Sequence, residues 1–438
     1  LMETNQTEAL LSSEPSINET IEKPVVSDLP ADPSNPLVET KDDDEVNASI
    51  WGSISNMTNN VLGAGLVALA SAVCQSSLIP GIVVLFLMAV ISCCSQNVIV
   101  SSCRIVDKYT YKEMGIAIFG KTGGMIISII MLCYTILSCT SYFVIIGDMV
   151  TKVTMFFFPT VSILQKRYIV VPVICILFIF PLCMMRTVDS LKYVSIFSVL
   201  AVVVVVVVIV QQFVQYHHIN ETVEVLKWST GIVRVIPVIC VSYNCHYNAP
   251  RYYKELKDRS PARMWTVSIG STIIVFVLYL LASVCGYLEF GADTDGDILN
   301  NYPSNSVVPA VARIFLLIAI VCTFPIAYFA VRNNLHTIFC QQLHFHSFKL
   351  RLVTAVSVLI ATCTVSCFAA SVEDVIGLNG SLFGSLIMLV IPGLMYLYCS
   401  TGSIWKPSRF ASLLLTIFGV CVCIGGTYLR ILKIMHKA

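Results

Sequence analysis

Residues 56–72 read NMTNNVLGAGLVALASA, an apolar stretch that could cross a bilayer but contains residues unfavourable to a membrane helix. A Gly-Ala-Gly sequence at 63–65 lies in its middle, and glycine weakens a helix by about 1 kcal/mol relative to alanine. Asn59 and Asn60 add amide side chains, which are costly in hydrocarbon. A helix that unwinds here frees N–H groups for a carboxylate and carbonyl groups for a cation. The pattern therefore predicts a ligand site at a helix break.

A second apolar stretch, residues 238–251, shows the same kind of interruption. Its sequence, VICVSYNCHYNAPR, begins apolar and becomes polar at Ser242, Asn244 and His246 before Pro250. It follows the first interrupted stretch by five predicted spans. Two broken spans at corresponding positions of two five-span halves are typical of inverted-repeat transporters, whose site lies between them at mid-membrane. The halves share no visible sequence similarity, so the repeat is inferred from spacing and hydropathy.

The composition places the chain in a lipid bilayer. Of 438 residues, 56% are hydrophobic and 12% charged, with a mean hydropathy of +0.82, whereas soluble domains carry about 25% charged residues. The net charge of +1 provides no basic field for nucleic acid. Residues 199–210 include nine valines and favour a strand, but an isolated strand cannot satisfy its backbone in lipid. We therefore expect an all-α membrane protein with eleven transmembrane helices, at about 51–76, 79–103, 122–150, 168–185, 190–214, 229–248, 264–288, 306–332, 350–370, 375–399 and 409–432.

The sequence predicts three regions along the chain. Residues 1–50 hold twelve acidic residues and two lysines, a composition typical of a disordered tail. A transporter core follows at 51–400, with its two halves at about 51–214 and 229–399. Residues 401–438 supply the last loop, the eleventh helix and a short C-terminal tail. Two interpretations of the acidic tail stay open, a solvated segment and a docking segment for cytoplasmic regulators.

Lysine and arginine are distributed unevenly between the predicted loops. With the N-terminus in the cytoplasm, sixteen lie in cytoplasmic loops and seven in outer loops and the C-terminal tail. The positive-inside rule therefore predicts a cytoplasmic N-terminus and an outer C-terminus. The sequon at Asn220 falls in an outer loop and predicts glycosylation there, whereas the sequons at Asn5, Asn18 and Asn47 favour the reverse orientation. We expect the plasma membrane, with an organelle membrane as the alternative.

Four further polar residues within the spans have two interpretations each. Thr323 lies just before Pro325, and proline frees a carbonyl upstream, so this region forms either a sodium ligand or a packing kink. His246 either makes transport sensitive to pH or is a hydrogen-bonded structural residue. Asp148 and Arg313 are interpreted as capped or paired charges in preference to ligands. No nucleophile–base pair, metal cluster or cofactor motif is visible in the spans, and we expect no enzymatic activity.

Several motifs resemble one family of membrane proteins. Residues 56–65 (NMTNNVLGAG) resemble the first-span signature of the amino acid/auxin permease family, and especially the N-x-S-N-x-x-x-G-S/T-G pattern of its sodium-coupled neutral amino acid transporter branch. Residues 242–248 are similar to the family's F-x-C-H-x-N/E motif. Residues 286–302 resemble its G-Y-x-x-F-G…D-I-L-x-N-Y segment, and residues 323–332 resemble its T-x-P…R stretch. The resemblance covers about residues 50–400.

The resemblance implies a LeuT-like fold with a five-plus-five inverted repeat, broken first and sixth helices, and secondary active transport of amino acids. It also implies that Asn59 and Thr323 hold a coupling Na⁺ and that the backbone at 63–65 receives the substrate carboxylate. Ala64 departs from the family's usual Ser or Thr, and the paired outer-loop cysteines of several sodium-coupled members are absent. Both departures leave proton coupling as the alternative to sodium.

We expect the amino acid to bind between the two breaks. Its carboxylate meets the N–H groups of a half-helix N-terminus, and its ammonium meets carbonyls and side chains of the second break. The absence of an acidic residue from the predicted site favours neutral substrates. An amino acid-sensing transceptor that signals through the N-terminal tail is an alternative class, and no charge ring or carbonyl filter supports a channel. The expected substrate-binding residues are Asn60, Gly63, Ala64, Gly65, Ser242, Tyr243, Asn244 and His246.

Overall fold

The described part of the polypeptide folds almost entirely into helices. The structure, a computed structural model, describes residues 48–185, 192–216, 219–339, 348–369 and 371–437. Within these ranges the single strand-like contact is a parallel bridge between Ala48 and Leu256. Helices satisfy their own backbone hydrogen bonds, which is the requirement that hydrocarbon imposes. The expectation of an all-α protein is confirmed, and the valine-rich stretch is helical as well.

The first predicted span is broken in its middle. α1 (Ile50–Val61) and α2 (Gly65–Ser76) meet at an angle of 63°. Ser49 caps the start of α1 by accepting a hydrogen bond from the N–H of Gly52. Leu62 ends α1 with an extended backbone, at ψ 109°. The break falls at the Gly-Ala-Gly sequence because glycine makes the non-helical turn inexpensive.

The sixth predicted span is interrupted as well. α8 (Gly231–Ser242) ends where the polar residues begin, and a turn at 243–245 leads to the short η5 (His246–Asn248) and α9 (Ala249–Glu255). Pro250 lies in the first turn of α9. Backbone N–H groups in this turn have no carbonyl partner within the helix, so the missing N–H of proline costs no hydrogen bond. Both predicted breaks are therefore confirmed.

Eight further helices are long and apolar enough to cross a membrane in the described part of the chain. One of them, residues 372–399, passes through two π-helical stretches between its first and last segments. The predicted fourth span corresponds to a shorter apolar helix, Arg167–Cys183, which also contains a π-helical stretch. These elements lie at the positions of the predicted spans. They are α3 (Leu78–Val106), α4 (Tyr111–Phe157), α5 (Arg167–Ile174), α6 (Phe180–Cys183), α7 (Lys192–Tyr216), α10 (Pro261–Phe290), α11 (Val307–Phe339), α12 (Phe348–Phe368), α13 (Val372–Asn379), α14 (Ile391–Cys399) and α15 (Pro407–Lys437).

α4 extends beyond its predicted boundaries of 122 and 150. It begins at Tyr111, where the Thr110 side chain accepts a hydrogen bond from the N–H of Glu113. Gly120 then bends it, with φ 75° and ψ −178°. Glycine adopts this backbone readily, whereas other residues seldom do. A short capped helix therefore precedes the membrane-spanning part, in a stretch whose polar residues had indicated a loop.

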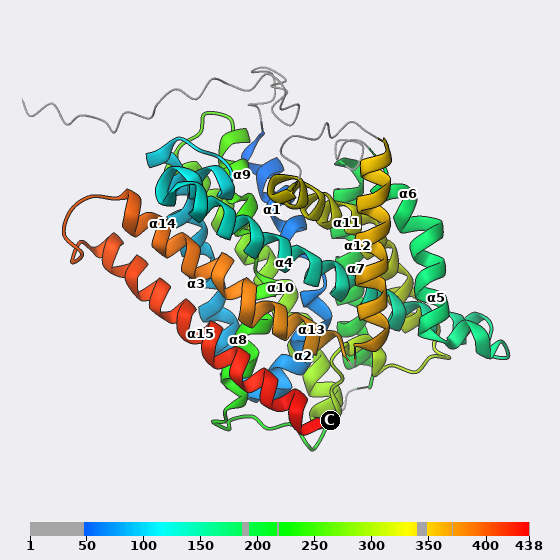
Figure 1. Cartoon of the computed structure of the whole chain (residues 1–438). Helices are drawn as coiled ribbons and strands as arrows, with labels where there is room; N and C mark the ends of the chain where they lie inside the picture. Colours follow the sequence, from blue (N-terminus) through cyan, green and yellow to red (C-terminus); the bar gives the residue numbers. More distant parts are fainter. Residues whose placement is uncertain (1–47, 186–191, 217–218, 340–347, 370, 438) are drawn as a thin grey trace, which may run out of the picture. The chain divides into compact units, whose positions relative to one another are not determined.

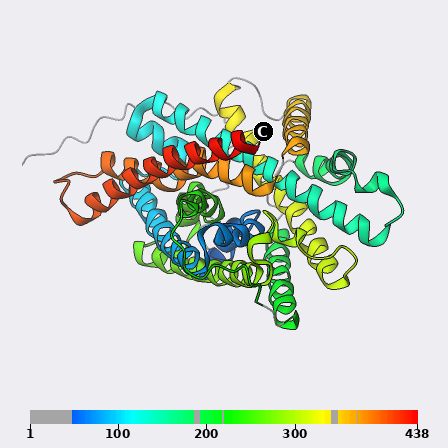
Figure 2. The same cartoon turned by 90° about the horizontal axis from the view of Figure 1, so that it is seen from below.

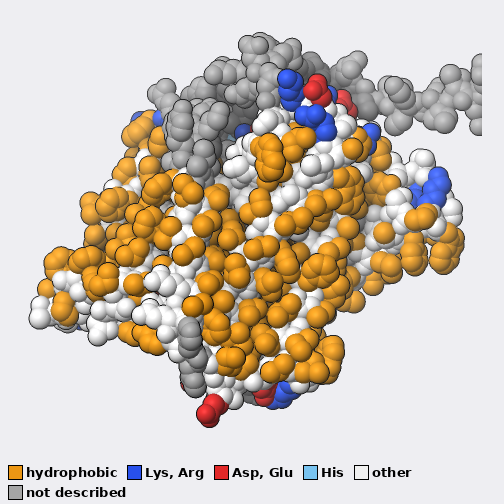
Figure 3. Space-filling model, turned by 180° about the vertical axis from the view of Figure 1, so that it is seen from behind, with side chains coloured by type: hydrophobic (Ala, Val, Ile, Leu, Met, Phe, Trp, Pro, Cys, Tyr) orange, Lys and Arg blue, Asp and Glu red, His pale blue; other side chains and the backbone are white. Residues whose placement is uncertain are grey.

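α2 lies in the interior of the helical bundle. Ten of its twelve residues are buried, and it contacts α3, α8 and α10, whereas α1 contacts α10 and α7 (Figures 1 and 2). We call the side on which α1 begins the proximal side and the side on which α2 ends the distal side. Figure 3 shows hydrophobic side chains across most of one face of the molecule. Such a surface suits contact with lipid chains, and the protein is a multi-pass membrane protein.

Two charged residues within the predicted spans have partners. Arg313 on α11 is fully buried, and its guanidinium donates to the carbonyls of Leu299 and Tyr302 in the preceding loop. Asp148 on α4 lies 3.5 Å from the guanidinium of Arg167. Both contacts agree with the interpretation of these residues as paired charges. The predicted acidic tail lies outside the described residues up to residue 47.

Candidate functional site

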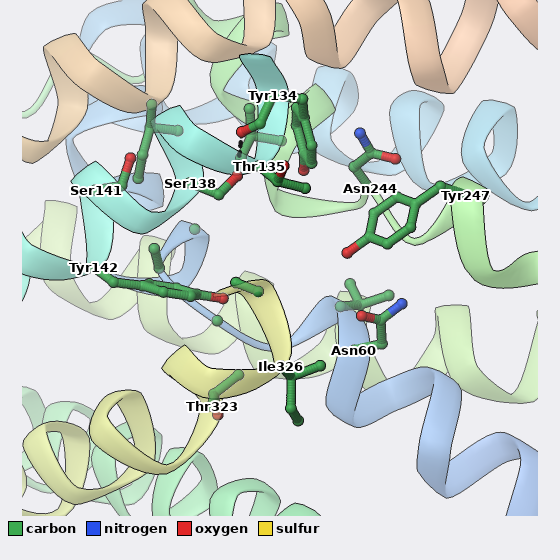
Figure 4. Close-up of a pocket in the computed structure, with 17 residues that line it drawn as sticks. Asn60, Tyr134, Thr135, Ser138, Ser141, Tyr142, Asn244, Tyr247, Thr323 and Ile326 are labelled. Carbon is green, nitrogen blue, oxygen red and sulfur yellow. Dashed lines mark hydrogen bonds between the residues drawn. The ribbon is translucent and has the colours of Figure 1, made fainter. Parts of the chain in front are cut away.

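A cavity of about 70 Å³ lies between the two broken helices. A water molecule needs about 10–15 Å³ of such space, so the cavity has room for about five waters or one small solute. Figure 4 shows side chains from α1, α4, α11 and the second break around this space. The structure thus brings several predicted site residues together. Those that line the cavity are Asn60, Gly63, Ala64, Gly65, Asn244 and Thr323.

The first break contributes backbone donors to the cavity. The N–H groups of Gly63, Ala64 and Gly65 donate to no acceptor in the described part of the chain, and the first bond after the break runs from Leu66 N–H to the Gly63 carbonyl, at 3.2 Å. These three residues precede or open α2, whose N-terminus carries the positive end of the helix dipole. Free N–H groups at a helix N-terminus form an anion site. A carboxylate is therefore the group that this wall suits best.

Two amide side chains face the cavity, one from each break (Figure 4). The Nδ2 atoms of Asn60 and Asn244 are buried and have no partner at hydrogen-bonding distance within the described structure, with the Tyr134 hydroxyl group near the Asn244 side chain. The Oδ1 atom of Asn244 accepts the N–H of His246, at 3.4 Å, which leaves its Nδ2 for another partner. Buried polar atoms without partners are rare in folded proteins. The two amides therefore mark places at which a polar ligand completes the structure.

The remaining walls combine aromatic and aliphatic side chains with the hydroxyl groups of Thr135, Ser138 and Ser141 on α4 (Figure 4). Tyr134, Tyr142 and Tyr247 line the cavity together with Ile326 and Ile376. None of the described residues that line the cavity is an aspartate, glutamate, lysine, arginine or histidine. A ligand side chain with a net charge would have no counter-ion here, and burying an unpaired charge is very costly. The lining therefore suits an amino acid whose side chain is neutral.

A second, smaller cavity of about 10 Å³ adjoins the first break. Gly63, Ser198 and Thr323 are among its lining residues, and its size is close to that of one water or one dehydrated cation. The Thr323 hydroxyl donates to the carbonyl of Ala319 at 2.8 Å and lies 3.1 Å from the Ser198 hydroxyl. Because Thr323 gives its proton to Ala319, its lone pairs are free to accept from Ser198 or to bind a cation.

Four of the predicted residues do not line either cavity. Ser242 is buried, donates to the Val238 carbonyl and packs against the first break. Tyr243 is buried with its ring edge-on to Tyr279. Both residues therefore contribute to the packing of the second break. Whether either one also contacts the substrate stays a prediction.

The other two are His246 and Asn59. The His246 ring is fully buried, and its Nε2 atom lies 3.2 Å from the Ser92 carbonyl on α3. This contact agrees with the structural interpretation of the histidine. Asn59 is buried with its Oδ1 atom unpartnered among the described residues. Its role as a sodium ligand stays a prediction, since its neighbour Asn60 lines the larger cavity instead.

Sequence reasoning missed the contribution of α4 and α7. Tyr134 and Tyr142 on α4 are eight residues apart and line the same cavity, a spacing that puts them on one helix face. Ser198 on α7 was also missed. A signal existed in both cases, because each residue interrupts an apolar helix with a polar group. That signal was weak, since tyrosine and serine are common in membrane helices as packing residues.

Buried charges lie on the distal side of the cavity. The Ser71 hydroxyl on α2 donates to Glu373 on α13 at 2.6 Å, and Glu373 lies 3.0 Å from Arg430 on α15. Ile376, one turn further along α13, lines the cavity. Breaking a buried ion pair by removing one partner costs about 3–5 kcal/mol. We call Ser71, Glu373 and Arg430 the distal tie, because they join α2, α13 and α15.

Partly exposed residues lie on the proximal side of the cavity. Asn60, Tyr247 and Ala327 line the cavity and are partly exposed. Asn56, one turn before Asn60 on α1, is exposed. A cavity with free backbone donors and amide side chains between two broken helices of an apolar bundle fits a membrane carrier of small polar solutes. The chain belongs to the transmembrane amino acid transporter protein family, whose model matches residues 46–432, and it is accordingly an amino acid transporter.

Individual relatives support this membership. The chain is 26% identical over 397 residues to sodium-coupled neutral amino acid transporter 7 of Xenopus laevis, covering 86% of this chain and 87% of that protein. It is 27% identical over 432 residues to amino acid transporter AVT6E of Arabidopsis thaliana, covering 92% and 87%. A putative sodium-coupled neutral amino acid transporter 11 of Danio rerio is 25% identical over 390 residues, covering 86% and 85%.

A solved structure shares the fold. The manganese transporter of Eremococcus coleocola, crystallised with an aromatic bis-isothiourea substituted compound, aligns with a TM-score of 0.56 over 86% of each chain, at 13% sequence identity. This likeness concerns the fold alone, because so low an identity carries no information on the ligand. The expected LeuT-like arrangement with broken first and sixth helices is confirmed.

Proposed function

We propose that this chain is a sodium-coupled carrier of small neutral amino acids that works by alternating access. The observation that carries the proposal is the cavity between the two breaks, where three backbone N–H groups lack an acceptor in the described part of the chain. These donors suit a carboxylate. The Nδ2 atoms of Asn60 and Asn244 supply two further hydrogen-bond donors for the substrate.

The substrate preference follows from the lining and the volume of the cavity. The described residues of its walls carry no charged side chain, so a charged substrate side chain would be desolvated without compensation. The volume of about 70 Å³ leaves room for a compact substrate, close to the five or six heavy atoms of the smallest amino acids. We therefore expect glycine, alanine or serine to bind more tightly than arginine, glutamate or tryptophan.

Sodium coupling is supported by the smaller cavity beside the first break. The Ser198 and Thr323 hydroxyls meet there next to Gly63, and oxygen atoms are the ligands that hard cations prefer. When a cation enters, the oxygen lone pairs of both hydroxyls can turn toward it. The names of two relatives, sodium-coupled neutral amino acid transporters 7 and 11, agree with this assignment.

Alternating access requires the cavity to open to one side at a time. In this conformation the distal tie lies on one side of the cavity, and the partly exposed residues lie on the other. Release of the Ser71–Glu373 hydrogen bond would free α2 from α13. From the lysine and arginine distribution we further propose that the proximal side faces the cytoplasm, so this conformation faces inward.

Three finer assignments remain proposals. The Asn220 side chain accepts hydrogen bonds from the Thr222 N–H and hydroxyl, and its modification by a glycan requires the distal side to face the lumen or cell exterior. We also propose that the protein resides in the plasma membrane and that cytoplasmic regulators bind its acidic N-terminal tail.

The function can be tested by uptake into proteoliposomes. Purified protein is reconstituted, and uptake of a panel of radiolabelled amino acids is measured with Na⁺ and pH varied independently. We expect uptake of small neutral substrates that stops when choline replaces Na⁺ at constant pH. Uptake driven by a proton gradient in the absence of Na⁺ would assign the chain to proton coupling instead. Failure of every amino acid in the panel to enter would contradict carriage itself.

A substitution at the first break tests whether the substrate binds there. Gly63→Val adds branched bulk where an added Cβ would already lie 3.2 Å from the Tyr142 hydroxyl, and we expect uptake to be abolished at normal surface expression. Gly425→Val on α15 is the matched control, because nothing lies within 4 Å of an added Cβ there. Normal uptake by the Gly63 variant would refute this placement of the substrate.

A further inference from the structure

The last carbonyl of α1 and the last carbonyl of α8 point at the same atom. The Tyr279 hydroxyl on α10 lies 3.0 Å from the carbonyl oxygen of Val61 and 2.9 Å from that of Ser242. Tyr279 is fully buried and does not line the substrate cavity. Val61 ends the first half-helix, and Ser242 ends the half-helix before the second break. One phenol therefore joins both breaks.

The electrostatics of this arrangement favour a cation. The C-terminal end of a helix carries partial negative charge on its unpaired carbonyls, and two such ends converge here. Freed carbonyls at half-helix C-termini are the groups that bind coupling cations in transporters with broken helices. A cation could satisfy both oxygens at once. A hydroxyl has a single proton, so it can donate fully to only one of them.

The Tyr279 hydroxyl lies at nearly equal distances from the carbonyl oxygens of Val61 and Ser242, so neither carbonyl alone accepts its proton. A small movement of either half-helix would lengthen one contact and give the proton to the other. α1 is fastened to α10 at a second point, where the Thr58 hydroxyl donates to Ser271 at 3.1 Å. Movement of α1 relative to α8 would therefore directly change the hydrogen bonds of the Tyr279 hydroxyl.

We propose that Tyr279 is a positioning residue of the transport cycle whose hydroxyl occupies the place of a cation between the two helix breaks. The proposal rests on the proposed function for its role in transport. The phenol supplies, as a fixed part of the protein, a hydroxyl hydrogen whose partial positive charge meets the converging carbonyls. It follows that the space between Val61 and Ser242 contributes no ion to coupling in the wild type, and that coupling depends on the cavity at Ser198 and Thr323.

The consequence is that removal of the hydroxyl creates a cation site. Tyr279→Phe leaves two helix-end carbonyls without a donor in a buried space. The ring edge still packs against Tyr243, whose centroid lies 5.4 Å away. A small cation entering this space binds the folded protein and not the unfolded chain, which stabilises the fold by mass action. Tyr287→Phe on the same helix is the matched control, because that hydroxyl bonds only to the loop at Glu224 in the described structure.

The test compares thermal unfolding of purified protein in NaCl and in choline chloride at equal ionic strength. For Tyr279→Phe we expect the melting temperature in NaCl to exceed that in choline by about 2 °C more than it does for the wild type. For Tyr287→Phe the salt difference should equal that of the wild type. In proteoliposomes, uptake by Tyr279→Phe should depend on Na⁺ concentration more steeply than wild-type uptake.

The outcomes separate this proposal from the proposed function. An equal salt difference for Tyr279→Phe and the wild type would overturn the proposal, whatever the uptake. A wild type that carries no amino acid would refute the proposed function, while the unfolding experiment still tests whether the phenol occupies a cation's place. If Tyr279→Phe cannot be purified, Tyr279→Ser serves as a second variant, because it opens space for a hydrated ion and should gain the same dependence on Na⁺.

Discussion

The two helix breaks differ in how their polar groups are used. At the first break, three N–H groups have no acceptor among the described residues, and the backbone itself lines the cavity. At the second break, Ser242 donates to Val238 and His246 lies within hydrogen-bond distance of Ser92. Of the residues predicted to bind substrate at this second break, Asn244 alone lines the cavity. The first break therefore lines the cavity with its backbone, whereas Ser242, Tyr243 and His246 of the second break lie outside the lining. The Tyr243 hydroxyl and the His246 Nδ1 atom are nevertheless buried without a partner in the described structure.

The difference has a physical origin in residue size. Gly65 allows α2 to approach Ser242 so closely that an added Cβ would lie 2.7 Å from the Ser242 Cα atom. Only a residue without a side chain fits such a close approach. This close approach of α2 brings the two breaks into contact and buries Ser242. A polar residue at a break can therefore bind a ligand only where it faces the cavity, as Asn244 does.

The largest expected effect comes from forcing the two breaks apart. Gly65→Ala would place Cβ 2.3 Å from the Ser242 hydroxyl and 2.7 Å from the Ser242 Cα atom, and the backbone atom cannot rotate away. We expect uptake to fall more than about 100-fold, which corresponds to about 3 kcal/mol. The measurement is initial uptake rate corrected for surface expression.

A double variant sharpens this prediction. Ser242→Gly removes the serine side chain, so Gly65→Ala/Ser242→Gly should recover part of the lost uptake. The backbone of residue 242 would still crowd the added methyl group, so the recovery should be incomplete. Gly425→Ala, with nothing within 4 Å of the added atom, should be neutral. Wild-type uptake by Gly65→Ala would show that the two breaks are not held together during transport.

The next effect tests whether each break donates to the substrate. Asn60→Leu removes a buried amide whose Nδ2 atom has no partner in the described structure, so the empty protein loses no bond. A hydrogen bond to a charged group contributes about 1.5–3 kcal/mol, and we expect KM to rise about 10- to 100-fold at an unchanged melting temperature. The same change at Asn244 should raise KM and also lower stability, since its Oδ1 atom accepts the His246 N–H.

Asn379→Leu on α13 is the control for these amides. Its Nδ2 atom already donates to the Tyr134 carbonyl and the Ser138 hydroxyl. Its removal should therefore lower the melting temperature while KM changes little. Equal KM values for Asn60→Leu and the wild type would remove this amide from the site and weaken the case that the first break binds the ligand through side chains.

A smaller effect is expected from the second break. His246→Phe removes the contact with the Ser92 carbonyl, and we expect a loss of about 1–2 kcal/mol in stability, seen as a melting temperature lower by about 2–4 °C. Since the ring does not line the cavity, KM should stay within about threefold of the wild type, less than about 1 kcal/mol. A rise in KM beyond about tenfold without loss of stability would make His246 a ligand and abolish the contrast between the breaks.

The sequence predicted the breaks well and the site only partly. Glycine and asparagine in an apolar stretch mark where a membrane helix cannot stay continuous, so both breaks were found. The rotation of each helix about its axis was not readable, because these helices are apolar nearly all round. Ser198 and Tyr279 were missed for this reason, although each interrupts an apolar stretch with a hydroxyl. Asn60, which was expected to bind the substrate, lines the cavity, whereas Asn59, which was expected to hold Na⁺, lines neither cavity.

The smallest effect concerns the first break itself. An added Cβ at Gly63 would lie 3.2 Å from the Tyr142 hydroxyl, the far end of a side chain that can move by a few tenths of an ångström. We expect Gly63→Ala to reduce uptake only about twofold, less than about 1 kcal/mol, in contrast to Gly65→Ala. Tyr142→Phe removes the contacting oxygen, so Gly63→Ala/Tyr142→Phe should transport no worse than Tyr142→Phe alone. A large loss for Gly63→Ala that the tyrosine change does not relieve would mean that the methyl group blocks the substrate directly, and the carboxylate would then lie closer to Gly63 than to Gly65.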